Sequence, residues 1–274
     1  MVVTTEVGLC EIAALMKRQT RGRFRLVGVD CLDMDRPWGQ PEVDLFPAAP
    51  GEVVDQLLAA GVPAEKNLPC GAPVDPAFGS LRDKAAIRRK LELEENVPVL
   101  LVIFGGLSFG KPLPIVTQIT KVRHPLQLVF LTRRHQRLTR EVRTLTANHP
   151  RTRVLGWVDN LHEWMAAADL LVGRTGGTTV TEALNSGLPI LGFDPPPGDE
   201  RRVCHLIEKW EVGHWVRSPE ELAPLIERLL THHEELERLR GNARARARPR
   251  AAHDAARAIL DLLKEESYIR TRWG

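Results

Sequence analysis

Residues 170–200 contain the pattern that most limits what this chain can fold into. A short apolar run, Leu170–Val172, leads into the pair Gly176–Gly177, and an amphipathic stretch then covers Thr179–Ser186. A second apolar run, Pro189–Phe193, follows at once. Strand, glycine turn, helix and strand in this order indicate a β-α-β unit, because parallel neighbouring strands need a long crossover connection. The segment therefore predicts an α/β fold built on a parallel sheet.

The same alternation covers residues 80–249 and predicts one complete Rossmann-like domain. Its strands are expected at Val99–Phe104, Leu126–Leu131, Arg153–Val158, Leu170–Val172, Ile190–Phe193 and His214–Val216. Its helices are expected at Ile115–Val122, Gln136–Ala147, Leu161–Ala168, Thr179–Ser186, Arg201–Trp210 and Glu220–Arg240. In a doubly wound sheet of this kind, ligands bind in the crevice at the carboxyl ends of the strands.

Residues 1–79 predict only part of a second Rossmann-like domain. Strands are expected at Val2–Thr4, Phe24–Val29 and Val43–Phe46, and helices at Glu11–Lys17 and Val53–Ala60. So few short strands do not make a complete sheet. Residues 250–274 form a third segment, in which a last helix is expected at Ala251–Lys264.

The turn after Val172 has the chemistry of a phosphate site. The first N–H groups of a helix have no partner within the helix, and the helix dipole is positive at that end. Gly176 and Gly177 let a phosphate approach these N–H groups, and Thr178 and Thr179 add hydroxyls. Glu182, one turn further on, can accept hydrogen bonds from a pair of sugar hydroxyls. An ordinary strand-to-helix turn with a glycine-rich corner is the alternative interpretation.

A longer set of motifs resembles the lipid-directed UDP-sugar glycosyltransferases, which include monogalactosyldiacylglycerol synthase, the diacylglycerol glucosyltransferases and the peptidoglycan N-acetylglucosaminyltransferase. The motifs are LLAAGVPAEKNLPCGAPVDPAF (57–78), VLLVIFGGLSFGK (99–111), TRRH (132–135), VLGWVDNLHEWMAAADLLV (154–172), GGTTVTEALNSGLPI (176–190) and PPPGDE (195–200). The resemblance implies a GT-B-type fold of two facing Rossmann-like domains. Residues 80–249 would form the complete UDP-sugar-binding domain and residues 1–79 part of the acceptor-side domain. The helix in residues 250–274 would cross back to that N-terminal part.

The resemblance also implies a donor site made by several loops. The uracil would be held by the backbone of Gly156, Trp157 and Val158, and the ribose by Glu182. The diphosphate would lie against Gly105, Gly106, Ser108, Gly110, Arg134, Gly176, Gly177, Thr178 and Thr179. The transferred sugar would contact Asp199 and Glu200.

The chain departs from the family pattern at several of these places. Arg133 and His135 replace the glycine and the asparagine of the family's T-G-R-N turn, and Asp199 replaces a glutamine. The resemblance therefore does not specify which sugar is transferred. On the acceptor side, Asp35 takes the place of a histidine. As a general base it would be weaker than histidine unless burial raised its pKa, because the ordinary pKa of an aspartate is about 4.

Residues 105–111 also satisfy the pattern GxxxxGK of a Walker A phosphate loop. The next residue is Pro112, where that loop needs a serine or threonine hydroxyl to hold magnesium. Because proline has neither a hydroxyl nor an N–H, a P-loop NTPase is a disfavoured alternative.

The predicted function is the inverting transfer of a hexose from a UDP-sugar to a membrane lipid such as diacylglycerol, without a metal or another cofactor. Asp35 would act as the base, and helix amino ends with Arg134 would stabilise the departing UDP. The alternative is a nucleotide-binding but inactive or split half that needs a partner chain. With only part of an acceptor domain, the chain is expected to transfer sugar poorly by itself. A homodimer or a partner subunit is expected to cover its open sheet edge.

Charge and composition limit the remaining classes. A net charge of +3 over 274 residues gives no nucleic-acid signature. The basic segments Lys17–Arg25 and Arg238–Arg250 are either solvated surface or contacts to an anionic membrane surface. The 4 cysteines lack CxxC spacing, so neither a disulfide frame nor a zinc site is predicted. No apolar run approaches the ~20 residues that span a bilayer. We therefore expect a cytoplasmic protein, peripheral on the inner face of the membrane.

Overall fold

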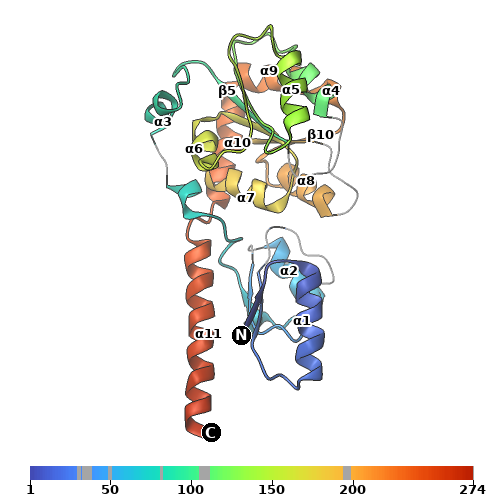
Figure 1. Ribbon diagram of the computed structural model, residues 1–274, viewed down its shortest axis with the longest axis vertical. Coiled ribbons are helices and arrows are strands. Elements are labelled where there is room, and N and C mark those ends of the chain that lie inside the picture. The colour runs from blue at the N-terminus through green and yellow to red at the C-terminus, as the bar shows by residue number, and fades with distance from the viewer. Residues whose placement is uncertain are drawn as a thin grey trace. The chain divides into compact units, whose positions relative to one another are not determined.

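The computed structural model describes residues 1–29, 32, 39–48, 51–80, 83–104, 112–193 and 199–273, without the side chains of 199–200 and 265–273. The chain divides into two compact units. The smaller unit combines residues 1–76 with residues 248–274, and the larger unit comprises residues 77–247. Both units combine helices with parallel strands, so the predicted α/β class is confirmed (Figure 1).

The larger unit contains a parallel sheet of six strands, in the order β10-β9-β8-β5-β6-β7. These strands are β5 (Val99–Ile103), β6 (Gln127–Leu131), β7 (Thr152–Leu155), β8 (Leu170–Gly173), β9 (Ile190–Phe193) and β10 (Gly213–Val216). When β5 is counted as the first strand, the order across the sheet is 6-5-4-1-2-3. That is the order of a doubly wound dinucleotide-binding fold, and it places the topological switch point between β5 and β8.

Helices cover both faces of this sheet. They are α3 (Lys84–Lys90), α4 (Pro112–Ile119), α5 (Gln136–Leu145), α6 (Leu161–Ala167), α7 (Gly177–Asn185), α8 (Asp199–Lys209), α9 (Leu222–Thr231) and α10 (His233–Arg246). Every residue of β5, β6, β8 and β9 is buried. This is why these strands read as continuous apolar runs and not as an alternation of apolar and polar residues.

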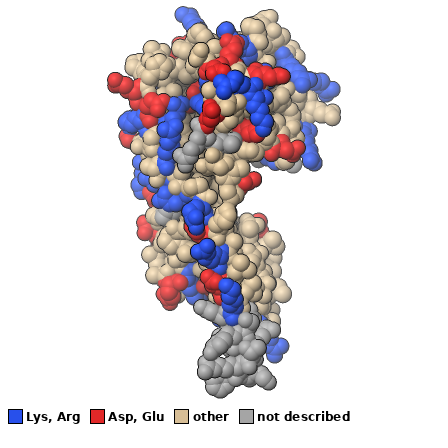
Figure 2. Space-filling model, turned by 90° about the vertical axis from the view of Figure 1, so that its left-hand side faces the viewer, with Lys and Arg blue, Asp and Glu red and all other residues tan. Residues whose placement is uncertain are grey.

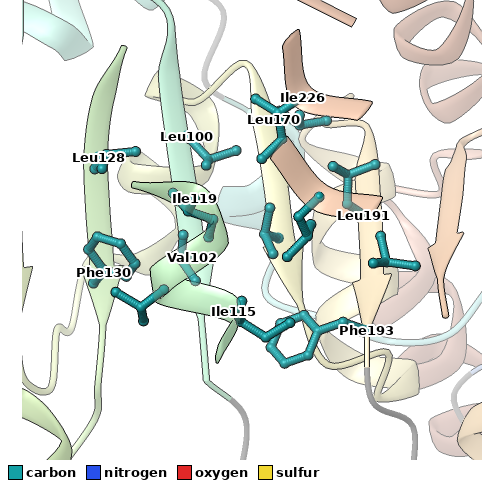
Figure 3. Close-up of a cluster of buried hydrophobic side chains, with 14 of the residues drawn as sticks. Leu100, Val102, Ile115, Ile119, Leu128, Phe130, Leu170, Leu191, Phe193 and Ile226 are labelled. Atoms are coloured by element: carbon teal, nitrogen blue, oxygen red, sulfur yellow. The ribbon is translucent and has the colours of Figure 1, made fainter. Parts of the chain in front are cut away.

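One face of the sheet forms the main core with α4 and α9. Because successive side chains of a strand point to opposite faces, alternate residues such as Leu100 and Val102 point to the same side. Figure 3 shows these two with Leu128 and Phe130 of β6, packed against Ile115 and Ile119 of α4. Leu191 and Phe193 of β9 and Ile226 of α9 extend the same cluster.

The sequence placed most of these elements correctly, but it missed α3 and made two further errors. The single helix expected over Glu220–Arg240 is wrong, because α9 and α10 are separate helices with His232 between them. His232 has φ −96° and ψ 77°, which is not a helical conformation. The strand expected to reach Val158 ends at Leu155, so Gly156, Trp157 and Val158 lie in the loop that follows β7.

The strands that the structure describes in the smaller unit are short and parallel. β1 (Val2–Thr4) pairs with β2 (Leu26–Gly28), and β3 (Phe46–Pro47) pairs with β4 (Asn67–Leu68). A single bridge between Val27 and Leu45 links the two pairs. The helices of this unit are α1 (Val7–Gln19), α2 (Glu52–Ala59) and α11 (Ala251–Trp273).

Gly71 joins the two separate stretches of chain that make up the smaller unit. It has φ +105°, and a Cβ at this position would lie 2.5 Å from Cβ of Arg248 and 3.1 Å from Cβ of Ala251. The left-handed conformation and the close approach both require glycine here. The start of α11 is therefore held against the segment that follows β4, and Ala251 is buried.

Candidate functional site

The switch point of the larger sheet lies where β5 and β8 run side by side. A Cβ at Gly173, the last residue of β8, would lie 3.3 Å from the carbonyl oxygen of Ile103 at the end of β5. The loops after these two strands therefore begin next to each other. In an open α/β sheet this edge is where ligands bind.

The amino end of α7 faces this edge directly after β8. Gly176 is the residue before the helix, with φ −68° and ψ 140°, and it makes no side-chain cap hydrogen bond. Thr178 in the first turn is exposed, and Thr179 is half-buried. Glycine at the cap position has no side-chain oxygen of the kind with which serine, threonine or aspartate accepts from the first N–H groups of a helix. This arrangement suits an anionic ligand.

The buried face of α7 fixes how the helix presents its other residues. Val180, Ala183 and Leu184 are buried, and the Thr181 hydroxyl donates to the carbonyl oxygen of Gly177 at 2.8 Å. Glu182 is half-buried in the second turn. The glycines, the two threonines and Glu182 are thus brought together on one short helix, as the sequence predicts.

Thr175 is a residue of this turn that sequence reasoning missed. It is fully buried, and its hydroxyl oxygen lies 3.1 Å from Sγ of Cys204 in α8. Its methyl group occupies the space beside Gly192 of β9, where a Cβ would lie only 2.3 Å from it. Thr175 therefore locks the β8–α7 turn against β9 and α8. Its place before Gly176–Gly177 was the only signal in the sequence.

A second cluster lies beyond the ends of β6 and β7. The guanidinium carbons of Arg133 and Arg134 lie 5.4 Å and 5.2 Å from the centre of the Trp157 ring system. The Trp157 side chain is half exposed, and its Nε1–H donates to Oδ1 of Asp159 at 2.7 Å. A Cβ at Gly156 would lie 3.1 Å from the carbonyl oxygen of Arg133, so the two loops are in close contact.

Arg133 has a backbone conformation that is unfavourable for a residue other than glycine. Its φ is +55°, in the left-handed region that favours glycine. The resembled family has glycine at this position, and the structure retains the conformation although an arginine occupies it. The predicted residues Arg134, Gly156 and Trp157 are thus brought together around this turn.

The structure does not describe several of the predicted site residues or their side chains. Asp35, Gly105, Gly106, Ser108 and Gly110 lie outside the described residues. Asp199 and Glu200 form the first turn of α8, but their side chains are not described. The roles predicted for these residues stay predictions.

The most perturbed ionisable groups lie at the opposite end of the sheet. Asp169 precedes β8, and its carboxylate contacts Lys84 (2.5 Å), Arg88 and Arg240 (3.4 Å). Burial lowers the pKa of Lys84 to about 8, against the raising effect of Asp169. This cluster connects α3 and α10 to the amino end of β8, and we assign it to stability. Among the residues described, no group of three His, Cys, Asp or Glu side chains could hold a metal ion.

One further surface feature lies away from the predicted residues that the structure describes. A cavity of about 650 Å³ lies between α4 and α5, lined by residues that include Leu113, Arg140 and Leu145. None of the predicted site residues that the structure describes lines it. In the part of the chain that the structure describes, no helix is both long and apolar enough to cross a membrane.

Many basic side chains of Lys17–Arg25 and Arg238–Arg250 contact other residues of the protein itself. Arg238 pairs with Glu211 at 2.7 Å, and Arg246 lies over the ring of Trp210. In the other segment, Lys17 is buried against Asp44, which also pairs with Arg25. Acidic and basic side chains are intermixed over the face drawn in Figure 2. The two segments therefore do not offer all of their charges to a membrane.

Comparisons with known proteins agree with the motifs. Residues 109–232 match the family model of the glycosyl transferases group 1. The chain is 24% identical over 242 residues to the processive diacylglycerol beta-glucosyltransferase of Staphylococcus saprophyticus, covering 88% of this chain and 62% of that protein. It is 28% identical over 256 residues to the chloroplastic monogalactosyldiacylglycerol synthase 2 of Arabidopsis thaliana, covering 90% and 54%.

A solved structure shares the fold at low identity. The chain superimposes on the UDP-GlcNAc 2-epimerase of Neisseria meningitidis bound to UDP-GlcNAc with a TM-score of 0.70 and 13% identity, covering 92% of this chain and 73% of that one. The predicted GT-B-type fold and the resemblance to lipid-directed glycosyltransferases are thus confirmed. The chain spans only 62% and 54% of the two curated relatives.

Proposed function

We propose that this chain binds a UDP-sugar and serves the transfer of a hexose to a membrane lipid such as diacylglycerol. The observation that carries the proposal is the glycine-capped amino end of α7 at the β5/β8 switch point, with Glu182 one turn further on. The relatives named for lipid glycosylation support the reaction. The fold does not select it, because an epimerase shares that fold.

The chemistry would be a direct displacement at the anomeric carbon of the sugar. The acceptor hydroxyl forms the new C–O bond, its proton goes to a base, and the bond to the UDP oxygen breaks. Negative charge then develops on the diphosphate, where the N–H groups of Gly177 and Thr178 and the guanidinium of Arg134 would stabilise it. Asp35 is the proposed base, and no metal is required for these steps.

The split interpretation is kept as the second candidate because of the coverage of the relatives. More than a third of each named relative has no counterpart in this chain. On this interpretation the chain binds the nucleotide, and a partner chain supplies what transfer still needs. Sugar transfer that appears only after a second polypeptide is added would favour it over a self-sufficient enzyme.

Calorimetry of UDP binding in the presence of EDTA tests the proposal. We expect binding without magnesium, and a loss of about 1–3 kcal/mol in Glu182→Ala because the ribose hydroxyls lose a charged acceptor. Glu220→Ala, an exposed change in the same unit, is the matched control and should bind UDP like the wild type. Equal affinity in wild type and Glu182→Ala would refute the assignment of this site.

Attachment to the inner face of an anionic membrane also stays a proposal, which rests on the lipid acceptors named for the relatives. Each basic residue near such a surface adds about 1 kcal/mol. Because many of the arginines are already engaged, we expect weak binding that is abolished at about 0.5 M salt, where the Debye length falls to roughly half of its physiological value. Sedimentation with phosphatidylglycerol vesicles measures it, and binding that depends on neither lipid charge nor salt would contradict it.

A further inference from the structure

The turn between β8 and α7 is held by the residues on either side of its two glycines. A Cβ at Gly176 would meet no atom of the described residues within 4 Å, apart from its neighbours in the chain. The buried residues nearest to the glycines along the chain are Thr175 before them and Val180 after them. The position of the first N–H groups of α7 therefore depends on how Thr175 and Val180 are held.

Thr175 is held through both branches of its side chain. Its hydroxyl oxygen lies 3.1 Å from Sγ of Cys204, and either group can donate the hydrogen bond. Its methyl carbon lies beside Gly192 of β9, where a Cβ would be only 2.3 Å away from it. Because a β-branched side chain has few favourable rotamers, the two contacts together fix the side chain and with it the backbone of the turn.

Strand β9 is the rigid side of this contact. Gly192 is paired with Gly173 of β8 on one side and with Trp215 of β10 on the other. A strand that is hydrogen-bonded on both sides cannot shift without disturbing two ladders. Thr175 belongs to neither β8 nor α7, so its backbone is not held by a ladder. A side chain at position 192 would therefore displace the turn and not the strand.

Cys204 extends the contact to helix α8. Val203 and Ile207, on either side of Cys204, are also buried, so this part of α8 packs into the core. The helix begins at Asp199 and Glu200, about 7 Å along its axis from Cys204. Because β8 and β9 are parallel neighbours, the helices that follow them begin at the same edge of the sheet. The contact with Cys204 thus sets the spacing between the amino ends of α7 and α8.

We propose that Thr175 is a positioning residue for the donor nucleotide. It sets the amino end of α7 against β9 through Gly192, and against α8 through Cys204. The inference rests on the proposed function for what is positioned, namely the diphosphate at α7 and the transferred sugar at the start of α8. Thr175 itself is 0% exposed, so it acts through the turn and not by touching the substrate.

Gly192→Ala and a compensating double variant test the contact with β9. The added Cβ should displace Thr175 and weaken UDP binding about tenfold or more, as expected when a hydrogen bond to a charged diphosphate is lost. Adding Thr175→Ser removes the methyl carbon that this Cβ would meet and keeps the hydroxyl beside Cys204, so most of the affinity should return. Calorimetry measures both. Unchanged affinity in Gly192→Ala, or no recovery in the double variant, would overturn the proposal.

Gly241→Ala is the matched control for this pair. It makes the same substitution in α10, where a Cβ would meet no described atom within 4 Å, and it should bind UDP like the wild type. If Gly192→Ala does not fold, recovery of both folding and UDP affinity in the double variant supports the proposal. A double variant that folds but does not bind UDP would contradict it.

Thr175→Val tests the contact with α8 separately, because it keeps the methyl group beside Gly192. The second methyl group needs about 3.5–4.0 Å from Sγ of Cys204 in place of the 3.1 Å of the hydroxyl, so α8 should move outwards. The dissociation constant of UDP-glucose, the probe for the sugar end, should then rise more than that of UDP. Equal changes for the two ligands, or no change, would overturn the connection to α8.

The amide signals of the ligand-free protein test the positioning without a nucleotide. In nitrogen–proton correlation spectra, the signals of Gly177 and Thr178 should move in Gly192→Ala, return in the double variant and stay in place in Gly241→Ala. If the signals follow this pattern but the wild type does not bind UDP, the proposed function fails while the positioning of the turn by Thr175 stands. If the wild type binds UDP but the signals do not move in Gly192→Ala, only the role of Thr175 fails.

Discussion

At the scale of single residues, Arg133 shows how a conformation can persist after its usual residue is lost. Its φ of +55° is strained for an arginine, and its guanidinium lies over Trp157. A non-glycine residue in this region costs on the order of 1–3 kcal/mol. An exposed cation–π contact returns only about 0.5–1 kcal/mol. The backbone strain at Arg133 is therefore larger than the stabilisation from its cation–π contact. The turn beside Gly156–Val158, the loop predicted to hold the uracil, is destabilised on balance.

This cost leads to a paired prediction. Arg133→Gly should have a free energy of unfolding equal to or higher than that of the wild type, because glycine adopts the left-handed conformation freely. Arg134→Gly removes the neighbouring guanidinium from Trp157 at a position without positive φ, and should lose about 0.5–1 kcal/mol. Urea denaturation measures both variants. Equal stabilities for the two would contradict the strain assigned to Arg133.

Asp169 is the shared counter-ion of several basic side chains in the larger unit. Its carboxylate accepts hydrogen bonds from Lys84, Arg88 and the N–H of Val99, the last at 2.7 Å. Asp169→Asn would leave these cations without their counter-ion, and we expect a loss of about 3–5 kcal/mol. The exposed pair of Arg137 and Glu141 offers the control, since Glu141→Gln should change stability by about 0.5 kcal/mol or less. A loss below 1 kcal/mol in Asp169→Asn, on the order of a surface pair, would contradict this role.

The pKa of Lys84 predicts how stability changes in alkaline solution. Burial lowers this pKa from 10.5 to about 8 in the folded chain. Between these values the folded chain has released the Lys84 proton and the unfolded chain still holds it, so this group makes stability rise with pH. The pKa of Lys84 sets the window from about pH 8 to 10. In this window the urea concentration at the midpoint of denaturation should therefore rise more in the wild type than in Lys84→Gln. Equal gains in both would contradict the lowered pKa.

At the scale of elements, the sequence predicted the buried strands best. Apolar runs such as Leu126–Leu131 and Ile190–Phe193 agree with β6 and β9 because strands covered on both faces contain few polar residues. The weak elements were missed or misplaced for the opposite reason. β4 has two residues and α3 is a short basic helix held by Asp169, so both depend on tertiary contacts that no local pattern records.

The candidate site was predictable in its glycine turn and not in its supports. Gly176–Gly177 before an amphipathic stretch indicated the amino end of α7, and the structure has the helix begin at Gly177. The contact of Thr175 with Cys204 joins residues 29 positions apart, so no local pattern indicates it. The cation–π cluster around Trp157 likewise depends on how two loops approach each other.

At the scale of the whole molecule, nucleotide binding and sugar transfer are expected to separate. The larger unit has a complete doubly wound sheet, whereas the described residues of the smaller unit form four strands of two or three residues. We expect the chain to bind UDP but to transfer sugar to diacylglycerol slowly, because positioning two substrates supplies several kcal/mol of a typical barrier, about 7–11 at most. A radiolabelled transfer assay measures this. Turnover at about 1 s⁻¹ or faster by the chain alone, an ordinary enzyme rate, would contradict it.

The central claim is that the amino end of α7, at the β5/β8 switch point, binds the diphosphate of a UDP-sugar. A crystal structure of the chain grown with UDP and EDTA tests it most directly. We expect diphosphate oxygens within hydrogen-bond distance of the N–H groups of Gly177 and Thr178, with the uracil against Gly156–Val158. UDP bound elsewhere, such as in the cavity between α4 and α5, with no ligand at the amino end of α7, would contradict this assignment of the diphosphate site.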